Sequence, residues 1–310
     1  MYGQRTLKRG ITLVLHCDVS KMVLLNKTLE LWEGPVSICV FIPTKNLTVS
    51  TIKTIDQYRA WFPRMIVTIY SSDDTYPINI LRNRAAQKTE TELAFPIDLD
   101  FLPNPDLYSN LMNMYDEMVR NSERSLYVVP AFNYNFNFEN HSSFSFVENP
   151  FPTTKEDLMM AVEVGNVSYS HWGNAHLPTN YPKWMNSTEM YRIKPGWNYE
   201  PYIVASFKYV PFFDERFIVY GDDKTQWHRH MAFLDYEYWV VPDCFIIHVP
   251  HKLHNWAGKE RKEVLPRVIT WIKEFSEDLM GKNSATKVNI LSIPPFILYI
   301  SILWLFGLLQ

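Results

Sequence analysis

Short apolar runs alternate with amphipathic segments along the first hundred residues of the chain. Apolar and β-branched residues fill positions 11–16, 36–42, 65–70 and 93–97, and each run has the length of a buried strand. Between these runs, residues 21–31, 51–62 and 78–87 carry apolar side chains at helical spacing. Regular alternation of strand and helix predicts an α/β fold built on parallel strands.

The pattern becomes less regular after residue 100. We expect helices at 107–120, 154–164, 224–234 and 264–280, and strands at 126–132, 202–210, 236–241 and 245–249. The aromatic and polar stretches 133–152 and 171–184 are expected to be loops. Because no repeat or linker interrupts the chain, residues 1–287 are predicted to form a single domain.

The C-terminal tail, residues 288–310, has a different composition. Residues 290–309 are almost wholly apolar and have about the length that crosses a bilayer as a helix. Pro294 and Pro295 lie near the start of this run and leave a shorter unbroken stretch. The tail is a candidate transmembrane segment, with a buried terminal segment or a mispredicted gene end as alternatives. The first ten residues are basic and polar and show no secretory signal peptide.

Composition narrows the classes of function. The net charge of −3 shows no excess of basic residues, so no nucleic-acid partner is expected. Aromatic residues make up 15% of the chain, which suits stacking on sugar rings but is equally consistent with an aromatic core. Three cysteines give no disulfide framework. Five N-x-S/T sequons favour the lumen of the secretory pathway, at Asn26, Asn46, Asn140, Asn166 and Asn186.

Two carboxylates, Asp98 and Asp100, follow the apolar run 93–97. In an extended chain both side chains would point to the same face. Ligands of parallel α/β sheets bind beyond the carboxyl ends of the strands, where these two residues would lie. The pair therefore predicts a site at which Mg²⁺ or Mn²⁺ holds a substrate diphosphate. The alternative is a strand that ends in a solvated acidic turn.

Two histidines, His248 and His251, flank the dipeptide Val249-Pro250 at the end of the last expected strand. Imidazole is the commonest protein ligand of transition metals, and Mn²⁺ accepts carboxylates and imidazole together. Either histidine is therefore a candidate to complete a metal site with Asp98 and Asp100. Each could equally be a hydrogen-bonded loop residue.

An acidic segment, residues 213–224, contains four carboxylates, Asp214, Glu215, Asp222 and Asp223. One of them could act as the general base that a sugar transfer with inversion requires. The alternatives are a turn after Gly221, a cap on the following helix, and an ion pair between Asp214 and Arg216. Arg82 and Asn83, on the helix before the acidic turn, could bind a nucleotide or a sugar carboxylate, or could lie on a solvated face.

Several ordered blocks carry a family resemblance over residues 11–280. They are TLELWEGPVSICVFIP, YPINILRNRAAQKTETELAFPIDLDFLPNPDLY, VVPAF, FPTTKEDL, AHLPTNYPKWMNSTEMYRI with WNYEPYIV, VPFFDERFIVYGDDKTQW and FIIHVPH. In these blocks the chain resembles the glucuronyltransferase family that includes the C-terminal catalytic domain of LARGE and the β-1,4-glucuronyltransferase of dystroglycan glycan synthesis.

The resemblance implies a GT-A, Rossmann-like nucleotide-diphospho-sugar transferase fold with a mixed, mainly parallel central sheet. It implies a Mn²⁺ (or Mg²⁺) cofactor, a UDP-sugar donor, in the first place UDP-glucuronate, and a glycoprotein glycan acceptor, matriglycan-like or related. It also implies a Golgi membrane location with a lumenal catalytic domain. Asp98 and Asp100 match the family's D-x-D motif. His248 matches the histidine assigned to the metal, with His251 as the second choice, and Arg82 and Asn83 match a block expected to bind the donor.

The chain departs from the family pattern at Asn133, where the family commonly has a glutamate after V-V-P-A-F. This difference leaves donor or acceptor specificity open. One alternative keeps the fold and uses another UDP-sugar, with xylose or an N-acetylhexosamine. The other is a catalytically silent, membrane-held glycan-binding protein.

Overall fold

The computed structural model describes residues 6–73, 76–136, 144–170, 175–218, 221–251 and 256–282. The strands are β1 (Lys8–Asp18), β2 (Val36–Pro43), β3 (Met65–Ser72), β4 (Thr91–Pro96), β5 (Phe101–Pro103), β6 (Ser125–Val129), β7 (Ala131–Tyr134), β8 (Val167–Tyr169), β9 (Tyr191–Ile193), β10 (Tyr202–Val204), β11 (Glu237–Val240) and β12 (Ile246–His248). The α-helices are α1 (Leu25–Leu31), α2 (Val49–Trp61), α3 (Ile78–Ala86), α4 (Leu107–Asn113), α5 (Tyr115–Arg120), α6 (Lys155–Glu163), α7 (Tyr181–Asn186), α8 (Thr225–Phe233) and α9 (Trp256–Lys282).

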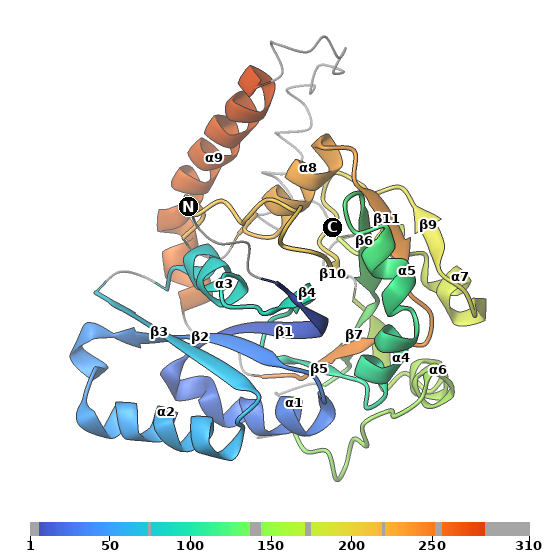
Figure 1. The fold of residues 1–310 in the computed structure, drawn as a ribbon, viewed down its shortest axis with the longest axis horizontal. Coiled ribbons are helices and arrows are strands. Elements are labelled where there is room, and N and C mark those ends of the chain that lie inside the picture. The colour runs from blue at the N-terminus through green and yellow to red at the C-terminus, as the bar shows by residue number, and fades with distance from the viewer. Residues whose placement is uncertain are drawn as a thin grey trace.

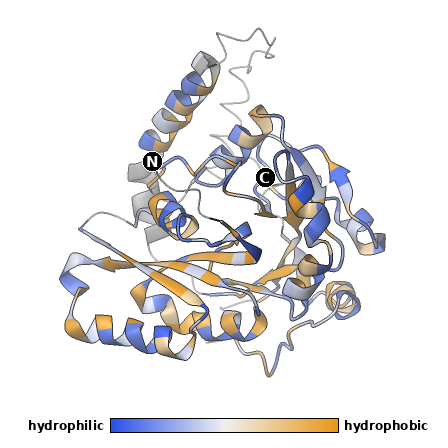
Figure 2. Ribbon diagram, in the orientation of Figure 1, coloured by the Kyte–Doolittle hydropathy of each residue, from blue (hydrophilic) through white to orange (hydrophobic). Residues whose placement is uncertain are grey.

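The first sheet has the order β3-β2-β1-β4, and its strands are all parallel. Helices α1 and α2 cover one face and α3 covers the other (Figure 1). Side chains alternate between the two faces along β1, so this strand contacts both helix layers. Leu13 and Leu15 pack on the side of α1 and α2, and Val14 packs on the side of α3. Figure 2 shows the apolar residues concentrated along these strands, between the helix layers. The prediction of a parallel α/β unit is confirmed here.

Two mixed four-stranded sheets complete the fold, with the orders β10-β6-β11-β9 and β5-β12-β7-β8. An isolated antiparallel bridge between Ala94 and Ala205 joins the first sheet to the end of β10. In the third sheet β12 lies between β5, its antiparallel neighbour, and β7, its parallel neighbour. The predicted mixed, mainly parallel central sheet therefore extends from β3 through β4 to the strands around β6.

Some boundaries differ from the sequence-based prediction. The strand expected at 126–132 is divided into β6 and β7 at Pro130, which has no N–H to donate. The helix expected at 107–120 is divided into α4 and α5 at Met114. The loop expected at 171–184 contains α7, which the Asn180 side chain caps by accepting a hydrogen bond from the Lys183 N–H.

Within the described residues, no helix combines the length and the apolar content needed to cross a membrane. The candidate transmembrane tail, residues 288–310, lies outside these residues. The extent of the single predicted domain, residues 1–287, stays a prediction.

Candidate active site

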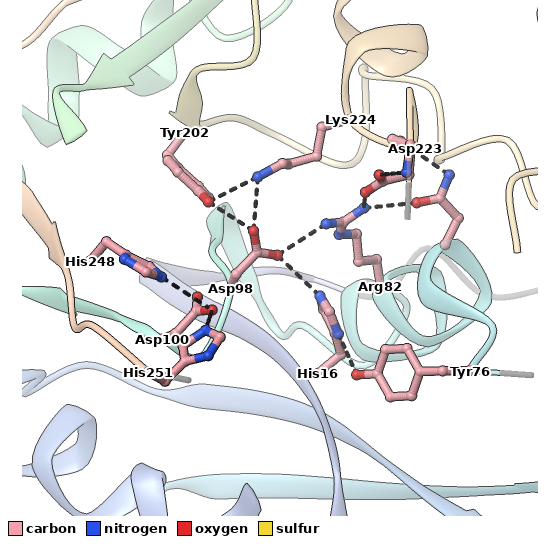
Figure 3. Close-up of polar contacts among 12 residues, drawn as sticks. His16, Tyr76, Arg82, Asp98, Asp100, Tyr202, Asp223, Lys224, His248 and His251 are labelled. Atoms are coloured by element: carbon pink, nitrogen blue, oxygen red, sulfur yellow. Dashed lines mark hydrogen bonds and ion pairs between the residues drawn. The ribbon is translucent and has the colours of Figure 1, made fainter. Parts of the chain in front are cut away.

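Asp98 and Asp100 lie in the connection between β4 and β5, at the carboxyl end of the first sheet. The expectation that they sit on one face of an extended strand is wrong. Residues 99 and 100 form a turn, closed by a hydrogen bond of 3.1 Å from the Phe101 N–H to the Asp98 carbonyl oxygen. Because the chain turns here, the two carboxylates contact different sets of partners (Figure 3).

Asp98 has polar partners from three elements and from the residue that precedes α8. Its Oδ1 accepts from Arg82 Nη2 at 3.0 Å and lies 3.3 Å from His16 Nε2. Its Oδ2 accepts from the Tyr202 hydroxyl and from Lys224 Nζ, both at 2.8 Å. Arg82 is on α3, His16 is on β1, Tyr202 begins β10 and Lys224 immediately precedes α8. The carboxylate therefore joins β1, α3, β10 and the residue before α8 at the carboxyl end of the first sheet.

Burial and charge act in opposite directions on Asp98. Burial by itself would raise the pKa of the Asp98 carboxyl, but the positive charges of Lys224 and Arg82 outweigh it and hold this pKa well below its ordinary range. Burial likewise works against the charged form of Lys224, and the nearby Asp98 carboxylate raises the pKa of the ammonium well above its usual value. Both groups are charged at neutral pH.

Arg82 connects Asp98 to the acidic segment. Its Nη1 donates to Asp223 Oδ2 at 2.6 Å and to Asn79 Oδ1 at 2.9 Å. The Arg82 side chain is only 4% exposed, so these contacts are made almost entirely out of water. On the other side of Asp98, His16 Nδ1 lies 2.7 Å from the Tyr76 hydroxyl. Burial lowers the pKa of His16, which keeps this imidazole neutral at pH 7.

Asp100, His248 and His251 form a candidate metal site. Asp100 Oδ2 lies 3.1 Å from His251 Nε2 and 3.6 Å from His248 Nε2. One ligand atom of each residue lies within 4.8 Å of the others. The second oxygen, Oδ1, is buried and has no hydrogen-bond partner among the described residues. The structure thus brings together three of the four predicted metal ligands, whereas the carboxylate oxygens of Asp98 contact Arg82, Lys224, Tyr202 and His16.

The place of β12 explains how the histidines reach Asp100. His248 ends β12 and pairs with Phe101 of β5 on one side and with Asn133 of β7 on the other. The His248 and Phe101 rings lie with their centroids 5.1 Å apart. Asn133, the position that departs from the family pattern, is therefore the immediate cross-strand neighbour of a metal-ligand candidate. Its Oδ1 is also buried without a partner within the described part of the chain.

The four carboxylates of the acidic segment are each held by another side chain. Asp214 accepts from Arg216 Nη2 at 2.6 Å, Glu215 accepts from Asn83 Nδ2 at 2.9 Å, and Asp222 and Asp223 pair with Arg229 and Arg82. Asp222 has a φ of 58° and follows Gly221 in the predicted turn. No side chain caps the start of α8, so these residues are not the helix caps that the sequence left open as an alternative.

Asn83 fastens the acidic segment to α3. Its Nδ2 donates to the Phe213 carbonyl oxygen at 2.8 Å, and its Oδ1 accepts from the Phe213 N–H at 2.9 Å. Asn79 donates in the same way to the carbonyl oxygens of Asp214 and Asp223. The Asn83 side chain thus bonds to the backbone of Phe213 and to Glu215, while Arg82 is the residue of this pair that reaches Asp98.

Three contacts at the site had no assignment from sequence: Lys224, Tyr202 and His16. Lys224 and Tyr202 do lie inside blocks that carry the family resemblance, GDDKTQW and EPYIV. Their roles depend on the side chains that the fold places beside Asp98, and no local spacing indicates such a contact. A small cavity beside Asp98 is lined by Arg82, Tyr202 and Lys224 together with neighbouring apolar residues.

A family model described as "Glycosyl-transferase for dystroglycan" matches residues 10–73 and 64–278. The chain belongs to this family. Among its relatives, the xylosyl- and glucuronyltransferase LARGE2s of Gallus gallus is 29% identical over 291 residues, which is 91% of this chain and 38% of that protein. The xylosyl- and glucuronyltransferase LARGE1 of Homo sapiens is 27% identical over 280 residues, 87% of this chain and 35% of that protein. A glycosyltransferase-like protein, gnt14 of Dictyostelium discoideum, is 30% identical over 257 residues, 81% of this chain and 39% of that protein.

The chain therefore spans less than two fifths of the length of these relatives. A crystal structure of GalNAc-T7 with UDP, GalNAc and Mn²⁺ superposes with a TM-score of 0.52 over 90% of this chain and 55% of that one, at 11% identity. This likeness confirms the predicted GT-A fold. The family resemblance predicted from the ordered sequence blocks is confirmed as well.

Proposed function

We propose that this chain transfers glucuronic acid from UDP-glucuronate to a sugar on a glycoprotein glycan, with inversion at the anomeric carbon and with a bound divalent cation. The observation that carries the proposal is the group formed by Asp100, His248 and His251 beside Asp98 and its two cations. Family membership and the names of the relatives support a glucuronyl donor. A matriglycan-like or related glycan is the proposed acceptor.

The three candidate ligands fit Mn²⁺ better than Mg²⁺. They offer one carboxylate and two imidazoles, and the buried Asp100 Oδ1 adds an oxygen without a partner in the described part of the chain. Mg²⁺ strongly prefers oxygen ligands, whereas Mn²⁺ accepts oxygen and imidazole together. When bound, the cation would offset the negative charge that develops on the departing diphosphate.

Lys224 is proposed to contact the donor, and Arg82 to hold the carboxylates beside it. Arg82 is 4% exposed and holds both Asp98 and Asp223, so its part is to fix the carboxylates. The Lys224 side chain is 19% exposed and makes single bonds to Asp98 and the Tyr202 hydroxyl. Its ammonium can exchange one of these bonds for a phosphate or uronate oxygen, because a point charge on a flexible stem adapts more readily than a buried guanidinium.

A Golgi membrane location with a lumenal catalytic domain is part of the proposal. The sequon residues Asn26, Asn46, Asn166 and Asn186 are all exposed, as sites for attached glycans must be. The apolar tail is the proposed means of membrane association.

The test is a donor panel with purified full-length chain. UDP release would be measured from UDP-glucuronate, UDP-xylose and UDP-N-acetylglucosamine, with methyl glycosides of common sugars as acceptors, and with Mn²⁺, Mg²⁺ or EDTA. We expect the fastest release from UDP-glucuronate with Mn²⁺ and none with EDTA. Faster turnover of another UDP-sugar would show that this sugar, and not UDP-glucuronate, is the donor. Metal-dependent binding of UDP without any turnover would favour the silent glycan-binding protein.

One substitution addresses the metal site directly. Asp100→Asn removes the negative charge between the two histidines, so we expect UDP release to fall at least about 100-fold and calorimetric Mn²⁺ affinity to fall about 10- to 100-fold. The control is Asp106→Asn, which makes the same chemical change at an exposed residue six positions along. Undiminished Mn²⁺ binding and turnover in Asp100→Asn would remove Asp100 from the site.

A further inference from the structure

Glu200 is a carboxylate at the edge of the site that the proposed roles so far leave unused. It lies two residues before Tyr202, where the chain enters β10. Its Oε1 accepts a hydrogen bond from the hydroxyl of Thr225, the first residue of α8, which immediately follows Lys224. The side chain is partly exposed, so solvent or a substrate hydroxyl can reach it.

The bonding of Glu200 differs from that of the acidic segment. The carboxylates of that segment are each engaged by a cation or an amide, through Arg216, Asn83, Arg229 and Arg82. Within the described residues, Glu200 has a hydroxyl as its hydrogen-bonding partner and no cation within ion-pair distance. A group that is to accept a proton needs lone pairs that are not already committed to a fixed positive charge, and Glu200 meets this condition.

The surroundings of Glu200 also raise its basicity. Burial raises the pKa of the Glu200 carboxyl above its ordinary value, and the negative charges of Asp223 and Asp222 act in the same direction. The positive charge of Lys224 and the hydrogen bond from Thr225 act in the opposite direction and do not cancel the increase. A carboxylate with a raised pKa takes up a proton more readily near neutral pH.

The contacts place Glu200 beside Lys224, because its Oε1 bonds to Thr225, the next residue along the chain. Lys224 Nζ is bonded to Asp98, and Asp98 is separated from Asp100 by one residue of the acidic turn. Lys224 is at the same time the main positive charge acting on Glu200. In the reaction proposed below, the diphosphate of the donor lies at Asp100 and its sugar lies near Lys224, the residue next to the partner of Glu200. Inversion requires the base on the side opposite the leaving group.

We propose that Glu200 is the general base of the transfer, an inference that rests on the proposed function. The acceptor hydroxyl oxygen forms a bond to the anomeric carbon while the bond from that carbon to the diphosphate oxygen breaks. The electron pair of the broken bond leaves with UDP, and the acceptor's proton passes to Glu200, which afterwards releases it to solvent. Glu200 is thus assigned the part that the sequence placed among Asp214, Glu215, Asp222 and Asp223.

The first test compares Glu200→Gln with wild type in the donor panel, at the donor and acceptor pair that wild type uses fastest. We expect kcat to fall about 100- to 10,000-fold, the usual range for loss of a general base. The calorimetric Kd for UDP with Mn²⁺ should stay within about twofold, because among the described residues the Glu200 carboxylate bonds to Thr225 and is not part of the candidate metal group. The matched control is Glu92→Gln, which changes another partly exposed glutamate that accepts a tyrosine hydroxyl far from the site.

The second test uses pH to separate a base from a positioning residue. Wild type should lose kcat/KM as pH falls through the raised pKa of Glu200, since the protonated carboxyl cannot accept a proton. Thr225→Val removes the hydrogen bond that lowers this pKa. The low-pH fall in kcat/KM, the acid limb of the profile, should therefore move to higher pH. Glu200→Gln should lack this limb.

Unchanged kcat in Glu200→Gln, or an acid limb at the same pH in wild type and Thr225→Val, would overturn the assignment while the transfer itself stands. If wild type releases no UDP from any donor, the proposed function and the assignment fail together.

Discussion

At the scale of single residues, Arg82 is the side chain on which the arrangement of charges depends most. It donates to Asp98, Asp223 and Asn79 while almost completely buried. A planar guanidinium can serve two carboxylates in different directions, which an ammonium cannot do from the same position. Its removal would leave the buried Asp223 and the partly buried Asp98 with one fixed cation, Lys224, beside Asp98.

We predict that Arg82→Met lowers the free energy of unfolding by about 3–5 kcal/mol, because it leaves buried charge uncompensated. Urea denaturation followed by circular dichroism measures the change. Arg82→Lys is the matched comparison. It keeps the positive charge but loses the two separate guanidinium nitrogens that bond to Asp98 and Asp223, so it should recover only part of the lost stability.

A double-mutant cycle with Asp223→Asn checks the mechanism of this loss. If Arg82 and Asp223 are coupled as their 2.6 Å contact indicates, the double variant should be more stable than the sum of the single losses by about 1–3 kcal/mol. Strict additivity of the two losses would show that the pair does not interact.

At this scale, the sequence indicates residues whose own side-chain chemistry suits a metal. Asp100, His248 and His251 were chosen because carboxylate and imidazole are metal ligands, and the fold brings them together. Prediction from the sequence did not find Glu200 or Lys224, because their chemistry arises from burial and from neighbours that are distant in sequence. It also treated residues 98–100 as extended, whereas the chain turns there.

At the scale of elements, α3 acts as the support of the acidic segment. Asn79 and Asn83, four residues apart on one helix face, bond to backbone groups of residues 213, 214 and 223. The described residues of the acidic segment form no strand. These side-chain hydrogen bonds therefore hold the segment in place of the backbone hydrogen bonds that strand pairing would provide. This arrangement positions Asp223 against Arg82.

We predict that Asn83→Leu loosens this segment without disturbing the first sheet. The change leaves the buried N–H and carbonyl oxygen of Phe213 without their partner, at a cost of about 1–3 kcal/mol each. Hydrogen–deuterium exchange should become faster in residues 210–218 and stay unchanged in β1 and β2. Equal exchange of residues 210–218 in wild type and Asn83→Leu would contradict the role given to the amide.

The elements that sequence predicted best are those with a strong local pattern. Strands β1 to β4 and helices α2 and α3 form one regular alternating unit, in which β1, β2 and β4 are almost entirely buried and β3 is partly buried at the edge. The short strands β7, β8 and β9 have three or four residues each, too few to show a period, and their pairing depends on partners far along the chain. Helix α7 was missed because its six residues include a proline and two aromatic residues.

At the scale of the whole molecule, buried neutral histidines make stability depend on pH. His228 lies on α8, 3% exposed, with its Nδ1 3.4 Å from the Tyr238 hydroxyl. Burial lowers the pKa of His228 to about 3, and the positive charges of Lys224, Arg82 and His176 act in the same direction. In the unfolded chain the same imidazole titrates near pH 6.5.

These two pKa values determine the direction in which the free energy of unfolding changes with pH. Above pH 6.5 the imidazole is neutral in both states, and as pH falls from 6.5 toward 3 the unfolded chain binds a proton that the folded chain does not. We predict that wild type loses about 2 kcal/mol more stability between pH 7 and pH 5 than His228→Gln does. Urea denaturation at the two pH values measures the difference, and equal losses in both proteins would show that His228 titrates normally.

The position of β12 has a consequence for how the chain folds as it is synthesised. This strand lies between β5 and β7, although it follows them by more than a hundred residues. Until residues 246–248 have emerged, β5 and β7 each present an open edge that could pair with another chain. The same strand delivers His248 to Asp100. The nascent chain therefore pairs these two open edges and brings His248 to Asp100 in one late step, so release before residue 246 would leave both edges open to aggregation and the candidate metal site without its histidines.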